Sequence, residues 1–139
     1  MKEKILICLY TVNINEKLVL DILGKIKKPV ASWDHEILIL INSSGESIAK
    51  TVDDSIKNLK SFNVKILFNL QNLGYGGNQK LAFYYAIKHG FDFVLVLAGS
   101  GQYAPEQFEE LVSALVKTNA PVVVGSRFLK KNSNVKNQM

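Results

Sequence analysis

Short polar loops follow the apolar runs of this sequence, and one of them holds residues whose types and spacing could do chemistry. The segment VLVLAGSGQYAPEQ, Val94 to Gln107, has the pattern of a buried strand, a small-residue loop and the start of a helix. Between Val94 and Pro105 it contains no acid, no base and no thiol. Amides, hydroxyls and backbone N–H groups can hydrogen-bond a ligand, so the segment indicates binding, and we identify no catalytic residue in it.

Other familiar chemical sites find little support in the sequence. Gly74, Gly76 and Gly77 do not form G-x-G-x-x-G, and no G-x-x-x-x-G-K-[ST] motif occurs. Gly76-Gly77 before a helix could present N–H groups to an anion, although a tight turn without a ligand is the commoner explanation. His35 and His89 are too isolated to bind a metal. The serines lack a G-x-S-x-G elbow, so we predict no nucleophilic catalysis.

The composition is that of one globular domain. The chain has 139 residues, of which 47% are apolar and 21% charged. Its apolar runs are far shorter than the roughly 20 residues of a membrane span, and no cleavage site follows the N-terminal run, so we expect a cytoplasmic protein. The net charge of +5 could attract phosphate, but basic and aromatic residues are not interleaved, and we predict no nucleic-acid partner. Cys8, the single cysteine, is expected to be a buried, inert thiol.

Strand and helix patterns alternate along the chain. The predicted strands are Ile5–Val12, Glu36–Asn42, Val64–Asn69, Phe93–Ala98 and Pro121–Gly125. Helical spacing covers Ile14–Lys27, Ser47–Lys60, Gly77–His89 and Pro105–Lys117. This alternation predicts an α/β fold, a three-layer Rossmann-like arrangement with a mainly parallel sheet. We expect a single domain over residues 1–129 and a polar tail over 130–139, and we expect at least two of Phe83, Tyr84 and Tyr85 in the core.

Four loops are expected at the edge of the sheet where its parallel strands end, which is where α/β proteins bind ligands. They cover residues 10–15, 42–47, 69–78 and 98–105, and they are rich in glycine, asparagine and serine. Such residues let a ligand approach the backbone closely. The candidate site is therefore this edge.

Three segments occur in an order that identifies a family. They are NLGYGGNQKLAFYYAIKHGFDFVLVL (Asn72 to Leu97), GQYAPEQFEELV (Gly101 to Val112) and VVVGSRF (Val122 to Phe128). Together they resemble the family 2 glycosyltransferases, particularly the branch similar to dolichyl-phosphate and polyprenyl-phosphate sugar synthases. Weaker similarity extends back through ILICLYTVNINE and ILILINSS, so the resemblance covers nearly the whole chain.

The resemblance implies the nucleotide-binding half of a GT-A fold, which binds a nucleoside diphosphate sugar, usually with Mg²⁺ or Mn²⁺. It also implies a polyprenyl phosphate as the sugar acceptor, at the cytoplasmic membrane surface. The positions that it assigns to the nucleotide-sugar site are Thr11, Asn13, Asn42, Asn72, Gly74, Asn78, Gly99, Ser100, Gln102 and Arg127.

The sequence departs from this family at the metal site. Relatives place an Asp-x-Asp-like pair before the Gly-Gln-Tyr motif, whereas this chain has Ala98-Gly99-Ser100. Mg²⁺ usually needs one or two carboxylates, and a neutral serine cannot replace that charge. We therefore predict no metal ligand, and whether the chain is an enzyme stays open. The alternative is a catalytically degenerate binding or assembly module, a pseudoenzyme.

Family members also continue past the Gly-Ser-Arg motif into an acceptor-binding half that carries the general base. In this chain Arg127 is followed only by the predicted tail. We expect that half to come from a partner subunit or a second copy of the chain, if transfer occurs.

Overall fold

The computed structural model describes residues 3–11, 16–26, 33–42, 46–57 and 63–126. The chain divides into two compact units, Met1–Glu106 and Gln107–Met139. The first unit holds the whole sheet and the helices α1 (Glu16–Lys25), α2 (Glu46–Lys57) and α3 (Gly74–His89). The tail predicted over residues 130–139 lies outside the described residues.

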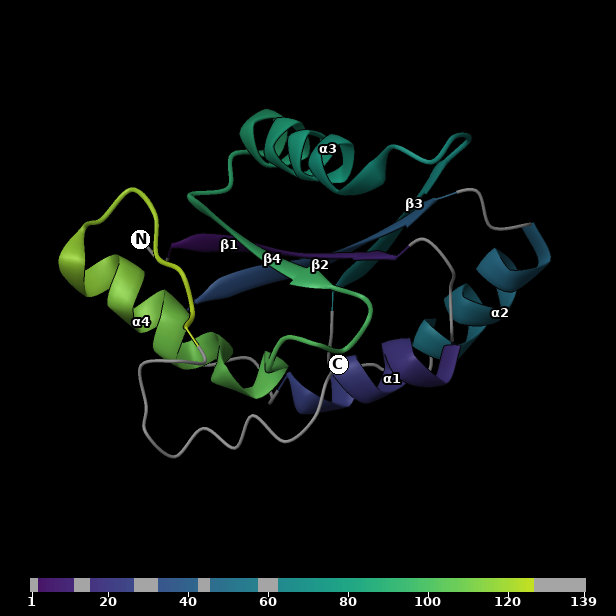
Figure 1. Ribbon diagram of the computed structural model, residues 1–139, viewed down its shortest axis with the longest axis horizontal. Helices are drawn as coiled ribbons and strands as arrows, with labels where there is room; N and C mark the ends of the chain where they lie inside the picture. Colours follow the sequence, from purple (N-terminus) through teal and green to yellow (C-terminus); the bar gives the residue numbers. More distant parts are fainter. Residues whose placement is uncertain (1–2, 12–15, 27–32, 43–45, 58–62, 127–139) are drawn as a thin grey trace. The chain divides into compact units, whose positions relative to one another are not determined.

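The first unit is built on four parallel strands. These are β1 (Lys4–Thr11), β2 (Asp34–Asn42), β3 (Val64–Asn69) and β4 (Phe93–Ala98), in the spatial order β3-β2-β1-β4. Figure 1 shows α3 on one face of this sheet and α1 and α2 on the other. The predicted α/β fold with a parallel sheet and three layers is confirmed, because β1, β2 and β3 are each followed by a helix that returns the chain to the end of the sheet where the next strand begins.

The core lies on both faces of the two central strands, β1 and β2. Their apolar runs are almost wholly buried, as expected for a parallel sheet with helices on each face. On the α3 face, Leu6, Cys8 and Leu38 pack with Ala82 and Ala86 of that helix. The small alanine side chains let α3 lie close to the sheet. This packing holds α3, whose start belongs to the candidate site, against β1 and β2.

The thiol of Cys8 should be unreactive in the folded protein. The residue is fully buried, and burial raises its pKa to about 12. Because a thiol reacts as the thiolate, a disulfide reagent at pH 8 should leave the native protein unmodified and should modify one thiol per chain after denaturation. Equal rates for the native and denatured protein would contradict this burial.

The part of the chain after β4 differs from the sequence prediction at one element. A 3₁₀ turn, Pro105–Gln107, precedes α4 (Phe108–Thr118), so most of the helix predicted over Pro105–Lys117 is present. The strand predicted over Pro121–Gly125 is wrong, because this stretch has no strand structure. Pro121 has no N–H to donate, and Val122 and Val124 are 71% and 79% exposed. β-branched residues alone do not make a strand without a partner strand.

Helix α3 also departs from the prediction. It begins at Gly74, three residues before the predicted start, and Phe83 and Tyr84 are exposed while Tyr85 is half-buried. The expectation that two of these aromatics lie in the core is therefore wrong, since alanines take the sheet-facing positions.

Among the helices of the described ranges, none combines the length and the hydropathy that crossing a bilayer requires.

Candidate functional site

The parallel register places polar strand ends in one row at the carboxyl edge of the sheet. Asn42 at the end of β2 is paired with Asn69 at the end of β3, and Tyr10 near the end of β1 is paired with Ala98 of β4. Helix α3 begins at Gly74, a few residues beyond the end of β3. The edge expected to bind a ligand therefore combines strand ends and one helix start from the first unit.

A chain of asparagine amides joins this edge to the first turn of α3. The Asn69 Nδ2 group donates to Asn42 Oδ1 at 2.8 Å and to Asn78 Oδ1 at 3.0 Å. Asn78 Nδ2 in turn donates to the Gly74 carbonyl at 2.7 Å. Asn42 and Asn78 are 0% and 1% exposed. Buried amides need such partners, so this chain of bonds fixes the helix start against the sheet.

The helix start is shaped by Gly74 and the residues before it. Gly74 has φ +63°, which an L side chain adopts only with strain, and its N–H donates to Asn72 Oδ1 at 2.9 Å. Leu73, the N-cap residue, makes no side-chain capping bond, and the first turn has no acidic residue. The positive end of α3 is therefore not neutralised by a carboxylate of that turn, which suits contact with an anion.

Gly99 packs directly against the end of β1. A Cβ atom at this position would lie 2.7 Å from Thr11 Cβ and 2.8 Å from the Tyr10 carbonyl oxygen. The Gly99 N–H donates to that same carbonyl at 2.8 Å. Only glycine allows this approach, and the contact brings the loop after β4 beside the end of β1.

Three tyrosines connect the end of β1, the start of α3 and the loop after β4. The Tyr10 and Tyr75 rings meet edge to face with centroids 5.0 Å apart. Tyr75 shares a hydrogen bond with Tyr103, and this bond, followed by burial, raises the Tyr75 pKa, whereas a bond from Gln79 lowers it. Tyr75 and Tyr103 are about half exposed. They are polar, aromatic side chains that a ligand at this edge can reach.

The structure divides the predicted site residues into an exposed and a buried group. The exposed ones are Asn72, Gly74, Ser100 and Gln102. The buried ones are Thr11, Asn42, Asn78 and Gly99. Asn13 and Arg127 lie outside the described residues. All described members belong to the first unit and lie on the loops and ends of its carboxyl edge.

Sequence reasoning did not select Asn69, Tyr75 or Tyr103. Asn69 is the centre of the amide chain, and the sequence does carry a signal for it, because it ends its apolar run as Asn42 ends the previous one. Tyr75 and Tyr103 stand within the glycine-containing segments LGYGG and GQY, and that neighbourhood is the signal that could have identified them.

The donor atoms at the end of β4 do not fit a divalent metal. Ala98, Gly99 and Ser100 offer no carboxylate there, and the described residues contain no group of three His, Cys, Asp or Glu side chains that could hold an ion. Asp92 lies at the opposite end of the strand, where its carboxylate accepts a 2.8 Å bond from the Lys4 N–H. We assign no reaction step to a metal.

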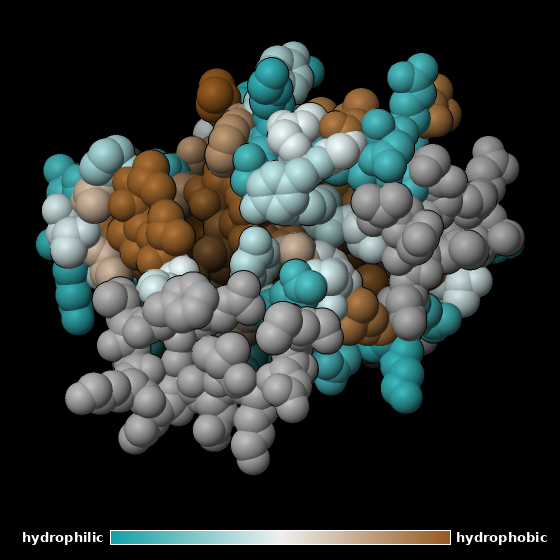
Figure 2. All heavy atoms as spheres, viewed as in Figure 1, coloured by the Kyte–Doolittle hydropathy of each residue, from teal (hydrophilic) through white to brown (hydrophobic). Residues whose placement is uncertain are grey.

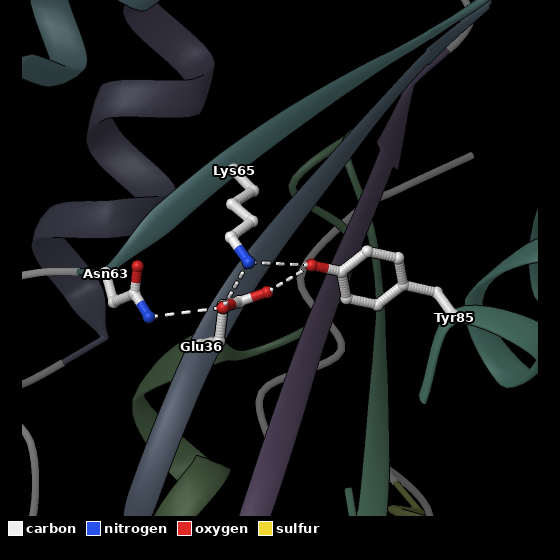
Figure 3. A network of polar contacts seen from close by, with 4 residues as sticks. All are labelled: Glu36, Asn63, Lys65 and Tyr85. Atoms are coloured by element: carbon white, nitrogen blue, oxygen red, sulfur yellow. Dashed lines mark hydrogen bonds and ion pairs between the residues drawn. The ribbon is translucent and has the colours of Figure 1, made fainter. Parts of the chain in front are cut away.

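A second polar cluster, distant from this edge, lies at the amino-terminal half of β2 (Figure 3). Glu36, 7% exposed, accepts bonds from Tyr85 Oη at 2.7 Å and Asn63 Nδ2 at 3.2 Å, and it pairs with Lys65 Nζ at 3.1 Å. Burial, followed by the bond to Glu36, raises the Tyr85 pKa, while the bond from Lys65 lowers it. The carboxylate has partners on all sides, so the cluster joins β2, β3 and α3.

Comparisons with known proteins bear on the family and the fold of this chain. The family model described as "Glycosyl transferase family 2" matches residues 5–139. A crystal structure of S. aureus TarS 1-349 matches with a TM-score of 0.62 at 19% identity, covering 91% of this chain and 40% of that one. The same protein in complex with UDP-GlcNAc matches with a TM-score of 0.57 at 18% identity, covering 94% and 39%. The chain thus spans about two fifths of these structures, and a search of curated proteins found no significant match.

Proposed function

The chain belongs to glycosyl transferase family 2, and on that premise we propose that the carboxyl edge of its sheet binds a nucleoside diphosphate sugar. One observation carries the proposal. The first turn of α3 has no acidic residue, and the half-buried Asn69 amide and the buried Asn78 amide hold this turn at the edge of the sheet where Gly99 packs against β1. The diphosphate is the natural partner for such a helix start.

Exposed and buried residues take different roles in this proposal. Asn72, Gly74, Ser100 and Gln102 contact the ligand with amide, hydroxyl and backbone groups. Asn42, Asn78, Thr11 and Gly99 hold the loops in place. Asn13 and Arg127 are proposed contacts on the basis of the family resemblance.

Similarity to known proteins supports our choice of a donor and an acceptor to propose. TarS has a structure in complex with UDP-GlcNAc, which makes a UDP-sugar the first ligand to test. The resemblance to polyprenyl-phosphate sugar synthases makes a polyprenyl phosphate, presented at the cytoplasmic membrane surface, our proposed acceptor.

A second candidate function is a binding or assembly module that does not transfer sugar. The observation that favours it is the neutral end of β4, where Ala98 and Ser100 stand at the metal-binding positions of the family. Both candidates share the nucleotide site and differ in whether a metal takes part.

A calorimetric titration with UDP-, GDP- and dTDP-sugars, with and without Mn²⁺, tests the proposal. We expect at least one sugar nucleotide to bind the wild-type protein with an affinity that Mn²⁺ leaves unchanged. Ser100→Asp should make binding increase with Mn²⁺, because it adds a carboxylate beside the diphosphate. Asn119→Asp, which adds the same charge at the exposed end of α4, is the control and should not.

The possible outcomes separate the two candidates. Metal-independent binding of the wild-type protein favours the binding module, whereas binding that Mn²⁺ strengthens favours the metal-dependent enzyme. Absence of binding to every sugar nucleotide would contradict both.

A further inference from the structure

Helix α3 carries two stripes of side chains on opposite sides. One stripe faces the sheet through Asn78, Ala82 and Ala86, which are at most 3% exposed. The other follows the spacing i, i+3, i+4, i+7, i+8, which keeps residues on a single helix face. This outward stripe consists of Lys80, Phe83, Tyr84, Ile87 and Lys88, all of them exposed.

The outward stripe exposes large apolar side chains that the described residues of the first unit leave uncovered. Phe83, Tyr84 and Ile87 are 46%, 62% and 80% exposed. Figure 2 shows apolar and polar side chains side by side along the rim where Figure 1 draws α3. A surface helix usually has one apolar face, so a second one indicates an interaction surface.

The charge of this surface is positive. The sixteen residues of α3 include Lys80, Lys88 and His89 and no aspartate or glutamate. Lys88 Nζ lies 5.9 Å from the Tyr84 ring centroid, so cationic and aromatic groups are adjacent within the stripe. The Glu36 carboxylate is engaged with Lys65 and lies on the sheet side of the helix. The partner of the stripe should therefore be apolar and anionic.

We propose that the outward stripe of α3 binds an anionic lipid surface, with Phe83, Tyr84 and Ile87 in the headgroup region and Lys80 and Lys88 on lipid phosphates. Exposed apolar side chains gain from entering the headgroup region, and lysines beside them are attracted to anionic lipid, so the stripe offers both contributions to binding at a bilayer surface. A second copy of the chain is a poorer partner, because a two-fold contact would bring lysines against lysines. Ile87, the most exposed member, has no ring on which a nucleobase could stack.

Lipid binding at the stripe requires no nucleotide, yet it would place a membrane close to the candidate site. Lys80 follows Gly74 by six residues, which is roughly 9 Å along the helix axis. A lipid-borne phosphate held near Lys80 would thus lie within reach of the helix start.

Vesicle cosedimentation tests this inference with the full 139-residue chain. The probes are vesicles of phosphatidylcholine alone and of phosphatidylcholine mixed equally with phosphatidylglycerol, at low and high salt. We expect binding to the anionic vesicles only, weakened by salt. Lys80→Gln/Lys88→Gln should lower the partition coefficient roughly 10- to 30-fold, since each lysine near the surface contributes about a factor of five. Phe83→Ser/Ile87→Ser should lower it by at least as much.

Matched variants control for net charge and for apolar exposure. Lys25→Gln/Lys57→Gln removes two lysines of α1 and α2, on the other face of the sheet, and Phe68→Ser removes a 48% exposed side chain of β3 that alternates with Lys65 and so lies on the face away from α3. Neither should lower vesicle binding as the stripe variants do, because these residues lie away from the stripe and distant exposed charges are largely screened by salt. The inference is overturned if anionic vesicles do not bind, if neutral vesicles bind equally, or if the control pair of lysines has the same effect as the stripe pair. Circular dichroism establishes that each variant is folded.

Discussion

Gly99→Ala should lower the free energy of unfolding by about 3 kcal/mol and abolish sugar-nucleotide binding. The new Cβ would lie 2.7 Å from Thr11 Cβ and 2.8 Å from the Tyr10 carbonyl oxygen, and backbone atoms cannot move aside as the end of a long side chain can. Relief requires displacing the loop after β4, which also breaks the 2.8 Å bond from the Gly99 N–H. Urea unfolding and a sugar-nucleotide titration measure the two effects.

Gly76→Ala is the matched control for this substitution. No atom lies within 4 Å of the Cβ that alanine would add there, and the residue lies inside α3. Because alanine favours helix over glycine, this variant should be more stable than the wild type by up to about 1 kcal/mol. Equal stability of the two alanine variants would mean that Gly99 does not approach β1 as closely as described.

Glu36→Ala, away from the candidate site, should lower the free energy of unfolding by about 3 kcal/mol. Its carboxylate is nearly buried and holds the Tyr85 hydroxyl, the Asn63 amide and the Lys65 ammonium group. Removing it deprives the half-buried Tyr85 hydroxyl of this acceptor and breaks the link from β2 to Lys65 of β3 and Tyr85 of α3. Urea unfolding at pH 7 measures the loss.

Two further variants show how much of the stability comes from the buried Glu36 carboxylate and how much from an exposed charge. Lys65→Met should cost only about 1 kcal/mol, because the Lys65 side chain is 49% exposed and water can replace part of the ion pair. Asp21→Ala removes an exposed carboxylate paired with Lys25 and should cost less than about 0.5 kcal/mol. A loss in Glu36→Ala no larger than that of Asp21→Ala would show that the cluster does not stabilise the fold.

The strands β1 and β2 could be predicted from the sequence because their runs are apolar at successive positions, which is typical of strands covered on both faces. The runs from Ile5 and from Glu36 must be buried on each side, so only a sheet covered by helices on both faces accommodates them. The carboxyl edge, with Asn42, Asn72 and Gly74, followed directly, because parallel strands end at one edge. The second unit was less predictable, since Val122 and Val124 look like a strand whose partner the sequence does not specify.

The details that the sequence did not reveal depend on register and on helix facing. Asn69 joins Asn42 and Asn78 only because β2 and β3 pair with their last residues opposite each other. The outward position of Phe83 and Tyr84 depends on which side of α3 faces the sheet. Helix α3 has apolar residues on both its inner and its outward side, so its sequence gives no clear periodic signal for that choice, and the aromatics were assigned to the core.

The central claim is that the carboxyl edge of the sheet binds a sugar nucleotide, and chemical-shift mapping on the ¹⁵N-labelled chain tests it most directly. UDP-GlcNAc should shift the backbone signals of Gly74, Gly99 and Ser100 and the side-chain amide signals of Asn69 and Asn78. Signals of Lys65 and Asp92, at the opposite edge, should stay in place. Shifts confined to that opposite edge, or no shifts at saturating nucleotide, would contradict the account.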